Sequence, residues 1–339
     1  MTAARYGSRP VDTPLDVVGV GNALVDVLSF EGDEFLAEHG LSKGAMTLID
    51  ADRAEMLYRD MGVGVEMSGG SAANTLAGVA SFGGRGGFIG RVRDDELGKV
   101  FAHDIRAVGV EFAGPTIEAG QPTGRCLIVV TPDGERTMNT LLGAASELAP
   151  DDIDPAFVAQ AKITYLEGYL FDQDAAGEAF HKASAAAHDA GRLVALTLSD
   201  SFCVERYLEA FRELVSDRVD VLFGNEHELT LLFETDDVEE AVARAEPHCD
   251  LIVVTLGSKG ALVSAGGRRV AVPVAPVERV VDTTGAGDLF AAGFLYGLSR
   301  DRDPETCGRL GALAAAEVIS HVGARPEASL AALAAPVLS

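Results

Sequence analysis

An aspartate at the end of a glycine-rich turn is the clearest candidate for chemistry in this sequence. Residues 282–288 read DTTGAGD, and the apolar stretch LFAAGFLYGL follows. The pattern predicts a helix entered through Gly285, Ala286 and Gly287, whose unpaired backbone N–H groups favour an anion such as phosphate. A carboxylate beside such a site suits proton removal from an attacking hydroxyl group. We therefore predict that Asp288 is a general base, kept ionised by the helix N-terminus; the alternative is an acid that merely begins a helix.

Polar residues near the N-terminus and around a second glycine pair suit the binding of hydroxyl groups. In MSGGSAAN, Gly69 and Gly70 allow a tight turn, and Asn74 follows about one helical turn later. An amide both donates and accepts hydrogen bonds, as a sugar hydroxyl requires. Asn22 and Asp26 follow an apolar run, and Asp26 needs partners if it is buried. Two vicinal ribose hydroxyls would supply them, although these residues could equally cap a helix or end a strand.

Strand-like segments are spaced along the chain and would position these residues. They are short, β-branched and almost continuously apolar, as in strands buried on both faces of a parallel sheet. Alanine-rich stretches at 175–191 and 199–215 are predicted helices between them. This alternation predicts a doubly wound α/β fold with a mostly parallel central sheet. The predicted strands are 15–21, 86–92, 125–131, 162–168, 192–199, 220–225 and 251–257.

Two stretches break the alternation and predict a second, smaller sheet. Residues 44–50 and 123–145 have strand character without an intervening helix, and PDGE at 132–135 is typical of a hairpin turn. We predict one core domain over 15–335, with a discontinuous β lid from about 38–50 and 121–145. Residues 1–14 are predicted to form a loose tail.

Composition excludes several classes of protein. The 339 residues carry a formal net charge of −25, which disfavours binding to nucleic acid or to an anionic membrane surface. No apolar run reaches the ~18 residues needed to span a bilayer, and nothing resembles a signal peptide, so we expect a cytoplasmic enzyme. The four cysteines are far apart and predicted to be reduced thiols.

The familiar nucleotide-binding fingerprints are missing. VVGVGNALVDV begins like a dinucleotide fingerprint, but Leu24 stands where GxGxxG requires glycine. No GxxxxGK[ST] loop occurs either. A nicotinamide-dependent oxidoreductase is therefore the weaker interpretation, and a sensor that binds without turnover is disfavoured by the intact GAGD.

Two motifs about 200 residues apart resemble the signatures of the PfkB carbohydrate kinase family, also called the ribokinase-like family. DTTGAGDLFAAGF is similar to the C-terminal signature, and GGSAAN followed by GRVRDDELG is similar to the N-terminal one. The resemblance covers roughly residues 16–330. It implies a ribokinase-like αβα sandwich with a small β-sheet lid, and ATP-dependent phosphorylation of a hydroxymethyl group. Asp288 would be the base, and the amides of Gly285, Ala286 and Gly287 would form the anion hole.

The segments around Asn22 and Asp26 are similar to the adenosine kinase branch. The likeness implies adenosine as substrate and AMP as product, with Gly69, Gly70 and Asn74 also binding the substrate. A PfkB-type sugar kinase, acting on ribose, fructose or a substrate like 2-keto-3-deoxygluconate, is the alternative.

Further substrate contacts follow from the same resemblance. GERTMNT implies that Arg136 stabilises the charge of the transferred phosphoryl group and that Met138 flanks the base. LSDSF implies that Phe202 contacts adenine. Leu170 falls where an aromatic residue stacks on adenine in eukaryotic adenosine kinases, so the base specificity is in doubt.

The ATP side is implied by shorter motifs. FGNEHEL contains Asn225 and Glu228, which the resemblance assigns to Mg²⁺, held through bound water; by itself this pattern fits a solvated helix start. Thr255, Gly257 and Gly260 would lie against the ribose and phosphates of ATP.

Three further features follow from the likeness or the composition. Ala314 and Val318 would pack against the adenine of ATP, and Asp282 with Thr284 could form a K⁺ site. The expected partner is a small nucleoside or sugar. The chain is expected to be a monomer or homodimer, since exposed lid edges can pair.

Overall fold

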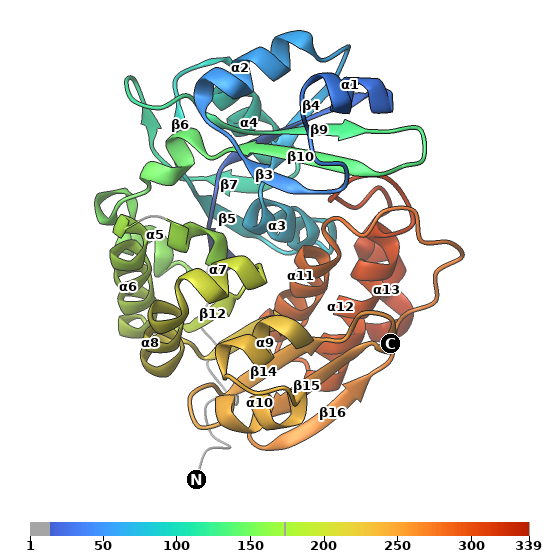
Figure 1. Ribbon diagram of the computed structural model, residues 1–339. Coiled ribbons are helices and arrows are strands. Elements are labelled where there is room, and N and C mark those ends of the chain that lie inside the picture. Colours follow the sequence, from blue (N-terminus) through green and yellow to red (C-terminus); the bar gives the residue numbers. More distant parts are fainter. Residues whose placement is uncertain (1–13, 173, 339) are drawn as a thin grey trace.

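The computed structural model describes residues 14–172 and 174–338 and contains a nine-stranded sheet (Figure 1). Its strand order is β16-β15-β14-β13-β12-β11-β1-β5-β7. The seven strands from β14 to β7 are parallel, and the antiparallel pair β15–β16 forms one edge. The bounds are β1 (Leu15–Val20), β5 (Gly86–Ile89), β7 (Val110–Phe112), β11 (Ala161–Glu167), β12 (Leu193–Thr197), β13 (Val221–Asn225), β14 (Leu251–Thr255), β15 (Ala261–Ala265) and β16 (Arg268–Val272).

Helices cover both faces of this sheet and enclose two hydrophobic cores. On β13, Val221 and Phe223 belong to one core and Leu222 to the other, because alternate strand residues point to opposite faces. The first core includes α3 (Ser71–Ser81), α11 (Ala286–Ser299), α12 (Pro304–Val318) and α13 (Leu330–Leu338). The second includes α5 (Pro155–Val158), α6 (Asp174–Asp189), α7 (Ser201–Arg206), α8 (Leu208–Arg218), α9 (Glu226–Leu232) and α10 (Val238–Ala245). These layers form the expected α/β sandwich.

The helix expected over 199–215 is interrupted. Tyr207, with φ −119° and ψ 32°, leaves helical geometry and separates α7 from α8. The first helix packs mainly against α9, whereas the second packs against both α6 and α9. The break allows α7 and α8 each to pack against its own set of neighbours. The apolar pattern of the sequence did not predict this break.

A five-stranded sheet lies beside the sandwich, in the order β3-β10-β9-β2-β4 (Figure 1). The hairpin turn occurs as expected, since Gly134 has φ +85° and its N–H donates to the carbonyl of Thr131. The strands β2 and β4 lie outside the ranges predicted for the lid, whose limits as a separate unit stay a prediction. The bounds are β2 (Leu24–Phe30), β3 (Met46–Leu48), β4 (Val65–Gly69), β9 (Gly124–Val130) and β10 (Arg136–Leu141).

Short elements complete the fold. Helix α2 packs on β9 and β10, and α4 packs on β2 and β4. No helix in the described part of the chain is long and apolar enough to cross a membrane. The remaining elements are α1 (Asp33–Glu38), α2 (Ala51–Asp60), α4 (Glu96–Ala107), the strand pair β6 (Val92–Arg93) and β8 (Thr116–Ile117), and 3₁₀ turns at Gly143–Glu147, Pro150–Asp152, Gly168–Asp172 and Gly257–Lys259.

The topology itself marks where a ligand should bind. Strand β1 has β5 on one side and β11 on the other, so the direction of winding reverses there. In open α/β sheets, the carboxyl ends of the strands at such a point border a crevice. Here the chain leaves β1 directly into β2, so the small sheet borders the same crevice.

Candidate active site

A cavity of about 780 Å³ opens between the two sheets. Strand ends, helix N-termini and the small sheet all contribute to its lining. Chain segments more than 200 residues apart in sequence therefore meet at one site. The sequence-predicted residues that line it are Asn22, Asp26, Gly70, Asn74, Met138, Phe202, Asn225, Glu228, Thr255, Thr284, Gly285, Ala286, Gly287 and Asp288.

The glycine-rich turn positions Asp288 as the first-turn acid of α11. Gly285 has φ +76°, and a Cβ there would collide with Ala324, so glycine is required before the helix begins. Gly287 has open space beside it and faces the cavity. The hydroxyl of Ser71 donates to Asp288 Oδ1 at 2.6 Å, and Asn74 Nδ2 lies 3.3 Å from Oδ2. The two predicted helix starts thus meet through this carboxylate.

Burial raises the pKa of Asp288 to about 6, and the hydrogen bonds from Ser71 and Asn74 only partly oppose this. The expected effect of the helix N-terminus is therefore outweighed by desolvation. The carboxylate is still largely ionised at neutral pH. A base whose pKa approaches the working pH accepts a proton more readily than an ordinary aspartate.

A second carboxylate faces the cavity from the small sheet. Asp26 lies on β2, and its carboxylate occupies the space beside Gly69 on the paired strand β4. Gly69 therefore supports the site without lining it. Burial, with a smaller contribution from Asp288, raises the pKa of Asp26 to about 6 although Arg325 and Arg136 oppose the rise.

Glu167, to which sequence reasoning assigned no role, holds Asn22 in place. Its Oε1 accepts hydrogen bonds from Asn22 Nδ2 at 2.8 Å and from the Asn22 N–H at 3.3 Å. Its Oε2 accepts from the N–H of Ala72 at 2.8 Å. Burial raises the pKa of Glu167 to about 7. The sequence does contain a signal for Glu167: it is a charged residue at the end of an apolar stretch that was predicted to form a strand.

Leu170 is not brought to the cavity. It is fully buried in the second core, because the 3₁₀ turn after β11 directs it away from the crevice. Its neighbour Tyr169 lines the cavity instead. Phe202 also lines it and is 74% exposed, while Met138 contributes from β10.

Arg136 pairs with an acid rather than lining the cavity. Its Nη1 lies 3.1 Å from Asp282 Oδ2, and both side chains are 9% exposed. Asp282 also accepts hydrogen bonds from the N–H groups of Thr284 at 2.9 Å and Gly323 at 3.0 Å. The carboxylate suggested for a K⁺ site is thus surrounded by donors, and that site stays a prediction.

The Asn225–Glu228 motif forms a reciprocal cap at the start of α9. Asn225 Oδ1 accepts from the Glu228 N–H at 2.9 Å, and Glu228 Oε2 accepts from the Asn225 N–H at 2.9 Å. Burial, with a smaller contribution from Asp200, raises the pKa of Glu228 to about 7, although the hydrogen bond from the Asn225 N–H opposes the rise. A carboxylate and an amide at a cavity wall are suitable oxygen ligands for a hydrated Mg²⁺ ion.

Of the five other residues predicted to contact ATP, one lines the cavity and four do not. Thr255 ends β14 and lines the cavity, but Gly257 and Gly260 lie in the following turn, outside the lining. Ala314 and Val318 are fully buried in the first core. Their small size serves the close packing of α12 on α11, so they are not accessible to a base in this structure.

Comparison with known proteins agrees with this geometry. Residues 48–330 match the pfkB family carbohydrate kinase profile. The crystal structure of an adenosine kinase from Sinorhizobium meliloti is 52% identical, with a TM-score of 0.87 over 94% of this chain and 98% of that one. Adenosine kinase 2 of Arabidopsis thaliana is 28% identical over 91% of this chain and 94% of its own length. Fructokinase-1 of Oryza sativa subsp. japonica is 30% identical over 70% of this chain and 75% of its own length.

The family profile covers most of the chain, including both glycine-rich helix starts and the cavity-lining residues of the nucleotide side. The sandwich with its small sheet is the ribokinase-like fold of these kinases. The chain therefore belongs to the pfkB family of carbohydrate kinases and is a phosphotransferase that acts on an alcohol group.

Proposed function

We propose that this enzyme transfers the γ-phosphoryl group of ATP to the 5′-hydroxyl group of adenosine, giving AMP. The observation that carries the proposal is the convergence of Asp26, Asn74 and Asp288 on one cavity beside the amides at the start of α11. The similarity to the adenosine kinase of Sinorhizobium meliloti supports the choice of acceptor.

In this proposal the acceptor lies between the two sheets. Asp26 accepts hydrogen bonds from the ribose hydroxyls, and Asn22 and Asn74 supply amide donors and acceptors. Gly70, with φ +96°, turns the chain so that α3 begins against the carbonyl of Asn22. Phe202 and Met138 offer apolar surface for the base.

Asp288 takes the proton of the attacking hydroxyl as the phosphoryl group moves. The N–H groups of Gly285, Ala286 and Gly287 face the charge that develops on the phosphoryl oxygens. Arg136, held by Asp282 at the entry to the same turn, adds positive charge nearby. Asn225 and Glu228 would hold Mg²⁺ through bound water, which would shield the charge of the ATP phosphates.

A sugar kinase of the same family is the second candidate. It is favoured by the similarity to a fructokinase and by the burial of Leu170, the position at which a base-stacking residue was expected. In that case Asp26 and Asn22 would bind sugar hydroxyls in the absence of a base.

An ADP-release assay with Mg-ATP separates the two candidates. Adenosine would be compared with inosine, guanosine, cytidine, ribose, fructose and 2-keto-3-deoxygluconate. Saturable turnover with adenosine at micromolar KM is expected. Turnover with a sugar and none with adenosine would overturn the nucleoside proposal while keeping the kinase chemistry.

A further inference from the structure

The loop between α12 and α13 (residues 319–329) reaches the site from a distant part of the chain. The N–H of Gly323 donates to Asp282, and Ala324 lies against Gly285 and lines the cavity. The next residue, Arg325, directs its Nε toward Asn74 Oδ1 at 3.3 Å. Three successive loop residues therefore contact two segments of the candidate site, the glycine-rich turn at 282–288 and the start of α3.

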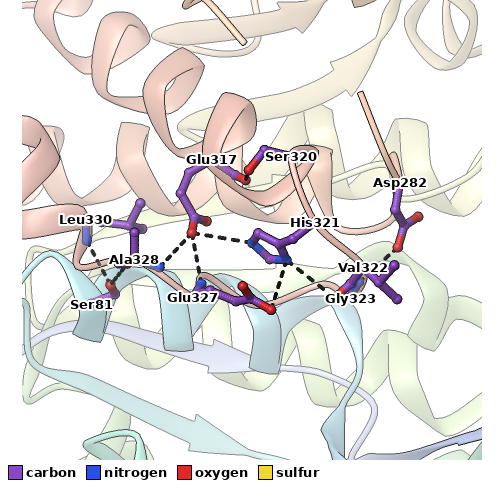
Figure 2. Close-up of polar contacts among 10 residues, drawn as sticks. All are labelled: Ser81, Asp282, Glu317, Ser320, His321, Val322, Gly323, Glu327, Ala328 and Leu330. Atoms are coloured by element: carbon purple, nitrogen blue, oxygen red, sulfur yellow. Dashed lines mark hydrogen bonds and ion pairs between the residues drawn. The ribbon is translucent and has the colours of Figure 1, made fainter. Parts of the chain in front are cut away.

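The far side of this loop is clamped to the core (Figure 2). Glu317 Oε1, at the end of α12, accepts hydrogen bonds from the N–H groups of Glu327 at 2.9 Å and Ala328 at 2.7 Å. The N–H of Leu330 donates to the hydroxyl of Ser81 on α3 at 3.1 Å. His321 lies 3.4 Å from the same Glu317 oxygen. The loop, and with it Arg325, is held at a defined place.

Arg325 determines which way the amide of Asn74 points. Because Oδ1 accepts from the Arg325 guanidinium, Nδ2 must be the group that faces Asp288 Oδ2. A rotated amide would place its own oxygen against the carboxylate, which repels it. Arginine has no acceptor atoms, so it can only select the first orientation.

The charge around Asp288 is strongly unbalanced. The carboxyl groups that interact with it are Asp26 from β2 and Glu167 from β11, whereas the nearby Tyr165 and Tyr169 are neutral because burial raises their pKa above the ordinary tyrosine value. Ser71 and Asn74, its partners on α3, are neutral.

Arg325 brings positive charge close to these carboxylates. The charges of Asp26 and Asp104 act on its guanidinium, and burial lowers its pKa. Its Nη2 is buried and, within residues 14–172 and 174–338, has no hydrogen-bond partner. Burying a guanidinium with an unpaired N–H donor destabilises a fold unless the charge interacts favourably with neighbouring groups.

We propose that Arg325 is a positioning residue for phosphoryl transfer, which orients the Asn74 amide so that its N–H holds the carboxylate of Asp288 ready to accept the proton. This rests on the proposed role of Asp288 as base. Arg325 acts through Asn74 and needs no contact of its own with the reacting atoms.

The first test is the ionisation of Asp288 itself, which needs no turnover. A ¹³C carboxyl titration, with Asp288 assigned by difference from Asp288→Asn, would be recorded for wild type, Arg325→Met and Arg325→Lys. Loss of the oriented amide should move the Asp288 midpoint in Arg325→Met upward by about one pH unit. Arg325→Lys, which keeps a cation and an N–H donor, should show a smaller shift in the same direction and replaces Arg325→Met if that variant does not fold. Arg309→Met, at an exposed position on α12, is the matched control.

The second test is a double-mutant cycle on kcat with the acceptor that the enzyme uses. Arg325→Met should lower kcat about 10- to 100-fold in wild type, but much less when Asn74 is already alanine. A shift of the Asp288 midpoint that is as large in the Asn74→Ala background as in wild type would come from the charge of Arg325 without passing through Asn74, and would overturn the inference.

An unchanged Asp288 midpoint in the folded Arg325 variants would overturn the inference, as would equal kcat losses with and without Asn74. Failure of every nucleoside and sugar as acceptor would instead overturn the proposed function, and the titration would still decide the role of Arg325.

Discussion

The proposed acceptor side and the proposed nucleotide side of the cavity are built differently. On the acceptor side, Asp288, Asn74 and Ser71 are tied together by side-chain hydrogen bonds across two helices. On the nucleotide side, Asn225 and Glu228 bond to each other within four residues of chain. Long-range contacts thus define one half, and local helix capping defines the other. Changes on the acceptor side should therefore affect chemistry, whereas changes on the nucleotide side should affect metal and ATP binding.

The largest effect is expected from Asp288→Asn. An amide cannot accept the hydroxyl proton, so kcat should fall about 10²- to 10⁴-fold while ATP still binds. Steady-state kinetics and ATP titration measure the two quantities. Asp236→Asn, on the surface, is the control and should behave like wild type. Activity close to wild type would remove Asp288 from the role of base.

The acid limb of the pH profile should reveal two carboxylates. In the proposed mechanism Asp288 and Asp26, each with a pKa of about 6, must be ionised, so at saturating Mg-ATP kcat/KM for the acceptor should fall as pH drops through about 6. With both groups titrating, the fall approaches 100-fold per pH unit, and Asp26→Asn should reduce it to tenfold. Profiles between about pH 5 and 8 test this. A limb of unchanged steepness in Asp26→Asn would exclude Asp26 as the second group.

Glu228→Gln should weaken the response to Mg²⁺ about tenfold and leave the acceptor KM unchanged, because glutamine keeps the helix cap but loses the charge. The cation favours the ionised form of Glu228, whose pKa is about 7, so Mg²⁺ should bind more tightly as pH rises through 7 in the wild type. Mg²⁺ activation curves at several pH values measure both effects. Glu226→Gln, whose side chain is 47% exposed, is the control. If Glu228→Gln instead raised the KM for the acceptor and left the Mg²⁺ response normal, the proposed division of the cavity into an acceptor side and a nucleotide side would be wrong.

The smallest effect is expected from Phe202→Ala. Loss of the exposed aromatic ring should raise the KM for adenosine about 3- to 10-fold with little change in stability. Leu170→Ala is the matched comparison: it should leave KM unchanged and lower the free energy of unfolding by ~2–5 kcal/mol, because it opens a cavity in the core. Kinetics and denaturant melts distinguish them. The opposite pattern would mean that Leu170, not Phe202, faces the base.

Local sequence determined the parts of this protein that depend on neighbouring residues. The buried parallel strands, the hairpin at 132–135 and the two glycine-led helix starts follow from apolar runs and turn chemistry that need no distant partner. Asp288 could be singled out because a carboxylate at a glycine-rich helix start, where backbone N–H groups favour an anion, is a recognisable local pattern. The two extra strands of the small sheet were missed because β4 is short and partly exposed and β2 is interrupted by Asp26.

Tertiary structure alone decided which side chains meet and in what electrostatic environment. Glu167 and Arg325 join the site from segments that carry no recognisable motif. Burial raises the pKa of Asp288, although a position in the first turn of a helix by itself favours the ionised form. No local sequence pattern predicts that burial. The same folding buries Leu170, Ala314 and Val318 in cores, because a side chain's direction depends on what packs against it and not on its place in a motif.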